Sequence, residues 1–141
     1  MATFNKYDQF ATDLAGGVHI LTTAGSTLKI ALTNTAPTAA TDAVLADVTQ
    51  INYANIDETV PADVTNVGAE TPAGTWDVSG TDVVLNASGA VATFQYVVLY
   101  NDTPTSPADP LIGWWDYGSG VTLASGESFT VDFGASIFTV A

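Results

Sequence analysis

Apolar residues are most concentrated between Val91 and Tyr100, where they occupy both faces of a predicted strand. One face carries Phe94, Tyr96, Val98 and Tyr100, and the other carries Gln95, Val97 and Leu99. Because both faces are largely apolar, we expect both to be covered and the strand to lie centrally in a sheet. Turn-forming residues follow from Asn101 to Pro110, and Leu111 to Tyr117 is predicted to return as the partner strand.

Shorter strand patterns recur along the rest of the chain, separated by turns rich in Gly and Ser. They fall at residues 28–33, 75–78, 82–85, 121–123, 129–133 and 137–140. Several short strands in succession predict a mainly β protein, an antiparallel β-sandwich or barrel with one short N-terminal helix. The sequence contains no internal repeat and no linker, so we predict a single β domain over residues 1–141.

The predicted helix spans residues 3–15, where apolar residues recur at steps of three and four. Thr3 is a suitable cap at its start, and Gly16 with Gly17 ends it. The apolar stripe is made of Phe4, Tyr7, Phe10, Ala11 and Leu14. We expect this stripe to dock on the sandwich; the alternative is a detachable arm that grips a neighbouring molecule.

Residues 57–74 show no sustained period, carry Pro61 and Pro72, and are acidic. We interpret them as a long acidic surface loop, with room for one strand around Val64 to Val67.

The net charge of the chain excludes more classes of function than its hydrophobic pattern does. The chain has 15 acidic residues against Lys6 and Lys29, which gives a net charge of −13. Nucleic acids are bound through Lys and Arg, so a nucleic-acid partner is not expected. The sequence contains no cysteine, no apolar run long enough to cross a bilayer and no signal-peptide pattern, so we expect synthesis in a cytoplasm and no membrane partner.

Candidate catalytic residues are few, and the sequence predicts no enzyme, no cofactor and no metal site. His19 is the single histidine, no Gly-x-Ser-x-Gly motif is present, and the calcium-loop pattern is missing. We expect a structural role for His19. A glycosidase would need two suitably spaced carboxylates, and Asp116 is the best candidate for one of them.

Trp114 and Trp115 are adjacent on a predicted strand and should point to opposite faces. One would fill the core, and the other would reach solvent or a partner. Three roles stay open for the pair: burial of both, a protein interface, or a platform for sugar stacking. The interface candidates are Phe4, Tyr7, Phe10, Leu14, Trp114, Trp115 and Tyr117.

Five blocks of the sequence resemble small virion structural proteins of tailed bacteriophages. They are residues 28–37, 44–53, 96–103, 109–118 and 121–133, and the N-terminal amphipathic stretch also fits the group. The resemblance covers most of the chain and is weakest at residues 57–74. It implies a head-associated protein, a capsid decoration or cement protein on the outer head surface, with no catalytic residues.

The resemblance also implies the partners: the major capsid protein and further copies of the chain itself, as a homotrimer. The virion would be the final location, after synthesis in the cytoplasm of a bacterial host. Two other functions stay open, namely another virion component (a tail or head-tail protein) and a carbohydrate-binding β-sandwich module on the virion surface.

Overall fold

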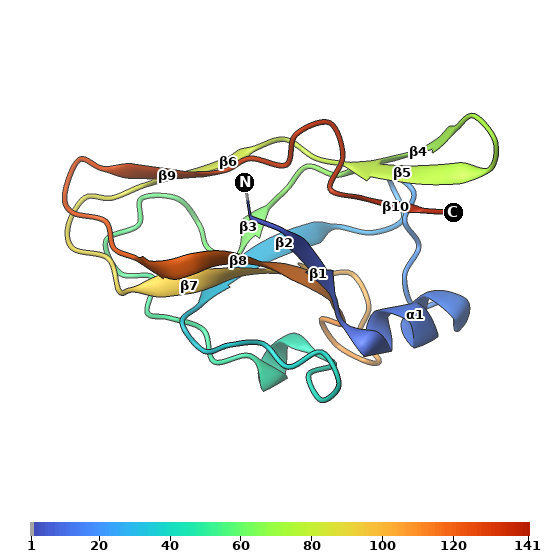
Figure 1. Ribbon diagram of the computed structural model, residues 1–141, viewed down its shortest axis with the longest axis horizontal. Helices are drawn as coiled ribbons and strands as arrows, with labels where there is room; N and C mark the ends of the chain where they lie inside the picture. The colour runs from blue at the N-terminus through green and yellow to red at the C-terminus, as the bar shows by residue number, and fades with distance from the viewer. Residues whose placement is uncertain (1) are drawn as a thin grey trace.

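The computed structural model describes residues 2–141, and its strands form two facing layers (Figure 1). One layer is a five-stranded antiparallel sheet in the order β1-β8-β7-β2-β3. Its strands are β1 (Phe4–Lys6), β2 (Leu28–Thr33), β3 (Ala62–Asp63), β7 (Phe94–Asn101) and β8 (Leu111–Val121).

The second layer lies along the top of Figure 1 and contains two smaller antiparallel sheets. A three-stranded sheet has the order β10-β5-β4, and β6 pairs with β9. These strands are β4 (Val67–Thr71), β5 (Thr75–Ser79), β6 (Val83–Asn86), β9 (Ser128–Val131) and β10 (Phe138–Val140). The protein is therefore mainly β, as predicted, and of the two expected architectures it adopts the sandwich.

Strand β7 lies in the middle of the five-stranded sheet, between β8 and β2, which confirms the predicted central position. Its inner face contributes Phe94, Val97 and Leu99 to the core between the layers. Its outer face is also covered, because Val98 and Tyr100 pack against Leu45 in the short 3-10 helix η1 (Leu45–Asp47). This helix belongs to the irregular segment below the sheet in Figure 1. Apolar residues on both faces of a strand thus correspond to cover on both faces.

The predicted helix over residues 3–15 is wrong in its first half. Residues Phe4–Lys6 form β1, which pairs with β8 so that Phe4 lies opposite Trp115. The helix α1 spans only Asp8–Ala15, and its N-cap residue, Tyr7, makes no side-chain capping bond, so the predicted Thr3 cap is not formed. A helix of this length is marginal by itself, and ladder hydrogen bonds to β8 stabilise the extended form of the preceding residues.

Residues 57–74 are also more ordered than predicted, because they contain β3 and β4 in place of one long loop. Strand β4 pairs with β5 across a turn in which Ala73 and Gly74 both have positive φ angles, 69° and 76°. Little in β4 is apolar, so its own pattern gives no strand signal. Pairing with the more apolar β5 determines its conformation.

Candidate interface

The structure divides the predicted N-terminal stripe between different parts of the molecule. The Phe4 ring lies 5.1 Å from Trp115 and 5.8 Å from Phe138, centroid to centroid, and Phe10 lies 5.6 Å from Phe138. Tyr7 turns the other way and packs under the outer face of the sheet, 4.6 Å from Trp114. The stripe is therefore docked on its own chain, as expected.

Burial divides the seven predicted interface residues into two groups. Tyr7, Phe10 and Trp115 are buried against other parts of the chain and offer no surface to a partner in this fold. The other four are half-buried and keep part of their surface: Phe4, Leu14, Trp114 and Tyr117. Trp114 and Trp115 do point to opposite faces, since Trp115 joins the core between the layers and Trp114 packs on the outer cluster.

An apolar groove of about 340 Å³ opens at the end of the sandwich where α1 faces the β4–β5 hairpin. The five residues that line it come from α1, the segment after it, β5 and β10: Leu14, Leu21, Thr22, Trp76 and Val140. Only Leu14 among them belongs to the predicted set.

Two local contacts position residues that line this groove. The Trp76 indole N–H donates to the carbonyl oxygen of Leu21 at 2.9 Å, which joins β5 to the segment after α1. Gly68 on β4 permits the close approach, because a Cβ at that position would lie 1.8 Å from the same oxygen. Any other residue at Gly68 would therefore push the segment that carries Leu21 away from β4.

One acidic side chain lies beside Trp76, a residue that lines the groove. Glu70 is exposed on β4 directly opposite Trp76, so both side chains lie on the same side of the hairpin. Neither lysine lines the groove, and Lys29 pairs with Asp102 at 2.9 Å. The site thus combines an apolar floor with an acidic neighbour.

A second, more polar hollow of about 490 Å³ lies beside β8. It is lined by Ala2, Thr3, Asp116, Tyr117 and Gly118. The Asp116 carboxylate accepts hydrogen bonds from the Gln95 side chain at 2.9 Å and from the Gly118 N–H at 2.7 Å. These bonds hold the pKa of Asp116 below its usual range, so this carboxylate is a charged acceptor at neutral pH and unsuited to general-acid catalysis.

Other candidate chemistry is limited. Within residues 2–141 no three His, Asp or Glu side chains come together as a metal site. Over the same residues, no helix has the length and apolar character needed to traverse a bilayer. His19 is buried, and its side chain is hydrogen-bonded to that of Asn101.

Comparison of the chain with protein-family models, with curated proteins and with solved structures gives no match. The resemblance to phage virion proteins stays a prediction.

The groove was missed by reasoning from the sequence because its residues are far apart in the chain. Two signals were available: Trp76 is the one tryptophan outside the Trp114–Trp115 pair, and Gly68 interrupts a stretch that proves to be a strand. A glycine inside a strand often marks a close backbone approach. Neither signal identifies Leu21 or Val140 as the neighbours.

Proposed function

We propose that the chain is a bacteriophage virion structural protein, a capsid decoration or cement protein that binds the outer surface of the head and stabilises the shell. The observation that carries this proposal is the apolar groove at one end of a strongly acidic β-sandwich. The resemblance of five sequence blocks to phage virion proteins supports the choice of partner.

Electrostatics favour the outside of the head. A protein with a net charge of −13 is repelled by packaged DNA, and this chain has only two lysines and no arginine to offset that repulsion. The outer surface imposes no such cost.

The groove has the size for one large apolar side chain, and we assign it to such a side chain of the major capsid protein. Burial of one Leu- or Phe-sized side chain stabilises a complex by roughly 1.5–3 kcal/mol. A second copy of the chain is a poorer occupant, because two acidic molecules repel each other at short range.

One such anchor gives weak attachment, and the proposed homotrimer would supply three. Linking three sites raises the overall affinity without any new kind of contact. The trimer would carry −39 (3 × −13), so its subunits need apolar contacts outside the groove to offset repulsion.

A second candidate function rests on the polar hollow beside β8. Tyr117 presents an aromatic ring there and Asp116 a charged acceptor, a combination that sugar-binding sites use. Trp114 gives this alternative less support, because its ring packs on Tyr7. Glycan binding by the isolated protein that is lost in Tyr117→Ala would favour this function over attachment through the groove.

The location of the protein in an image of the intact particle tests the proposal. We expect density for the sandwich on the outer head surface in many symmetry-related copies, with the α1 end against the shell. Density in the tail or at the head-tail junction would instead support the other virion role, and absence from the particle would refute both.

A further inference from the structure

The segment between α1 and β2, residues 16–27, places two polar side chains in the interior of the protein. His19 and Ser26 are 4% and 5% exposed. Both face Asn101, the last residue of β7, which is fully buried. Buried polar groups need hydrogen-bond partners, so these three side chains depend on one another.

The orientation of the Asn101 amide follows from its contacts. The Thr103 N–H donates to Asn101 Oδ1 at 3.1 Å, which directs the amide nitrogen toward Ser26 and His19. That nitrogen donates to Ser26 Oγ at 2.9 Å and lies 3.2 Å from His19 Nδ1. Because an amide nitrogen only donates, Nδ1 must accept, and the imidazole is neutral with its proton on Nε2.

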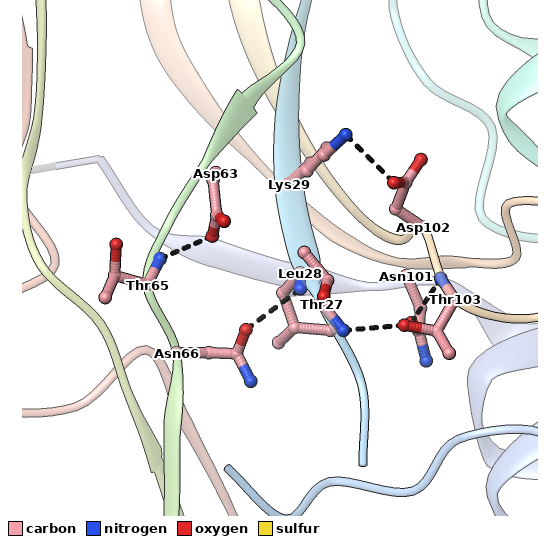
Figure 2. A network of polar contacts seen from close by, with 9 residues as sticks. All are labelled: Thr27, Leu28, Lys29, Asp63, Thr65, Asn66, Asn101, Asp102 and Thr103. Atoms are coloured by element: carbon pink, nitrogen blue, oxygen red, sulfur yellow. Dashed lines mark hydrogen bonds and ion pairs between the residues drawn. The ribbon is translucent and has the colours of Figure 1, made fainter. Parts of the chain in front are cut away.

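The same network reaches the start of β2 and Asn66, the residue before β4. Asn66 donates to the carbonyl oxygen of Ser26 at 3.0 Å and accepts from the Leu28 N–H at 2.9 Å. Figure 2 shows Asn66, Leu28 and Asn101 around the start of β2, with Thr103 beside Thr27. Three separate parts of the chain are thus joined through polar groups at one point.

On its other side His19 faces helix α1. The Phe10 ring lies 5.1 Å from the imidazole, and Asp13 is the acidic group that acts on it. Asp13 is 6% exposed; its Oδ1 accepts from Gln9 at 2.9 Å, whereas its Oδ2 and His19 Nε2 have no hydrogen-bond partner within residues 2–141.

The other two side chains in this polar cluster, those of Asn101 and Ser26, carry no charge. Asp102, the next residue after Asn101, is engaged by Lys29. Asp13 is therefore the charge that has to be considered in any effect of pH on this site.

Protonation of His19 conflicts with this arrangement in two ways. A proton on Nδ1 would face the amide N–H of Asn101, which places donor against donor. The charged ring would also lie in an interior that gives it little solvation. Burial lowers the pKa of His19, and the opposing attraction of Asp13 is the smaller effect.

We propose that His19 is a proton-sensitive latch: the neutral imidazole holds α1 and residues 16–27 against the ends of β2 and β7, and its protonation releases them. The released elements carry Leu14 and Leu21, on either side of His19 in the chain, so opening also alters the apolar groove. The latch stands on the burial of His19 and on its contacts with Asn101 and Phe10, whereas its effect on capsid attachment rests on the proposed function.

The sign of the pH effect follows from the direction of the shift. A histidine with a lowered pKa in the closed form gives full stability above its ordinary value of about 6.5, and that stability is lost as the pH falls below it. Because the closed form disfavours the proton, the opening constant rises as the pH falls from about 7.5 to about 5.5, by at most roughly tenfold for one histidine. Ordinary carboxylates titrate mainly below this window.

Hydrogen exchange of the α1 amides, corrected for the intrinsic effect of pH, measures this opening, and the amides of β8 serve as the internal control. We expect the α1 amides to lose protection over that range, by up to roughly tenfold, while those of β8 change little. The Trp76 indole N–H signal, which reports the bond to Leu21, should change over the same range.

Two variants test the assignment. His19→Asn keeps an acceptor for Asn101 and removes the titration, so its α1 protection should be level across the window. Asp13→Asn removes the attraction that opposes the lowered pKa, so its loss of protection should begin near the same pH as in the natural sequence and continue to lower pH.

The latch is refuted if α1 in the natural sequence shows level protection, or if His19→Asn keeps the same pH dependence. If a variant fails to fold, an NMR titration of His19 in the natural sequence tests the latch instead. A pKa at or above the ordinary value would contradict the proposal. If α1 opens as expected but particles bind the protein equally at both pH values, the latch stands and the link to attachment through the groove fails.

Discussion

The interior between the two sheets and the groove at the end of the sandwich are both apolar, but only the interior is filled by the chain itself. In the interior, Trp115 is 6% exposed and its ring meets Phe4 and Phe133 at centroid distances of 5.1 and 5.6 Å. In the groove, Trp76 is half-buried beside a space of about 340 Å³. The first arrangement stabilises the fold, and the second leaves apolar surface that a partner can cover.

The largest expected effect belongs to the interior. Trp115→Ala should lower the free energy of unfolding by roughly 3–5 kcal/mol, because it leaves a cavity among closely packed rings. Chemical denaturation measures the loss. Trp114→Ala is the matched control and should cost clearly less, since Trp114 is half-buried on the outer cluster. Equal losses for the two variants would contradict their assignment to different environments.

A smaller loss of stability is expected at Gly68, where β4 approaches the segment that carries Leu21. Gly68→Ala should destabilise the protein by about 1–3 kcal/mol, because the new methyl group would collide with the Leu21 carbonyl. The shift of that carbonyl should also displace the Trp76 indole N–H signal in an NMR spectrum. Ala69→Ser, on the opposite and exposed face of β4, serves as the control and should leave both unchanged. An unaltered indole signal in Gly68→Ala would show that the segment that carries Leu21 is not held against β4.

The smallest effect concerns the one ion pair among the described residues, Lys29 with Asp102. The two side chains are 29% and 36% exposed, so solvent screens their attraction. Asp102→Asn should therefore change the free energy of unfolding by less than about 1 kcal/mol, as measured by thermal or chemical denaturation. A loss comparable with that of Trp115→Ala would mean that polar contacts, and not the apolar interior, dominate the stability.

The sequence predicted those strands whose own residues show a clear pattern of apolar positions. Strand β7 has apolar residues on both faces, and its central position follows from that fact alone. Strand β4 has no such pattern, and it is a strand because β5 offers it a partner. Residues Phe4–Lys6 illustrate the opposite failure, since a helical period there was real but pairing with β8 overrode it.

The site was less predictable than the fold. Leu14 was one of the predicted interface candidates, but the groove needs Leu21, Trp76 and Val140 beside it, and no local signal brings these together. The buried contact between His19 and Asn101 joins residues that are 82 positions apart in the sequence. Contacts between residues this far apart in the sequence are formed only when the sheets assemble, so no local pattern predicts them.

Two matched variants test most directly the proposed attachment of the protein to the shell through the end groove. Thr22→Glu places a charge at the apolar groove, whereas Thr81→Glu adds the same charge at another exposed threonine, outside the groove lining. Substitutions at such exposed positions should change the free energy of unfolding by no more than about 0.5 kcal/mol. Binding to particles that lack the protein is then titrated for both variants and for the natural sequence, at NaCl concentrations from about 0.05 M to about 0.3 M.

We expect Thr22→Glu to lose affinity by at least about tenfold, equivalent to roughly 1.4 kcal/mol, and Thr81→Glu to bind like the natural sequence. Affinity of the natural sequence should stay level or rise with salt, because apolar contacts are not screened and repulsion between acidic copies is. Equal binding by the two variants, or a steep loss of binding as salt increases, would contradict attachment through the groove.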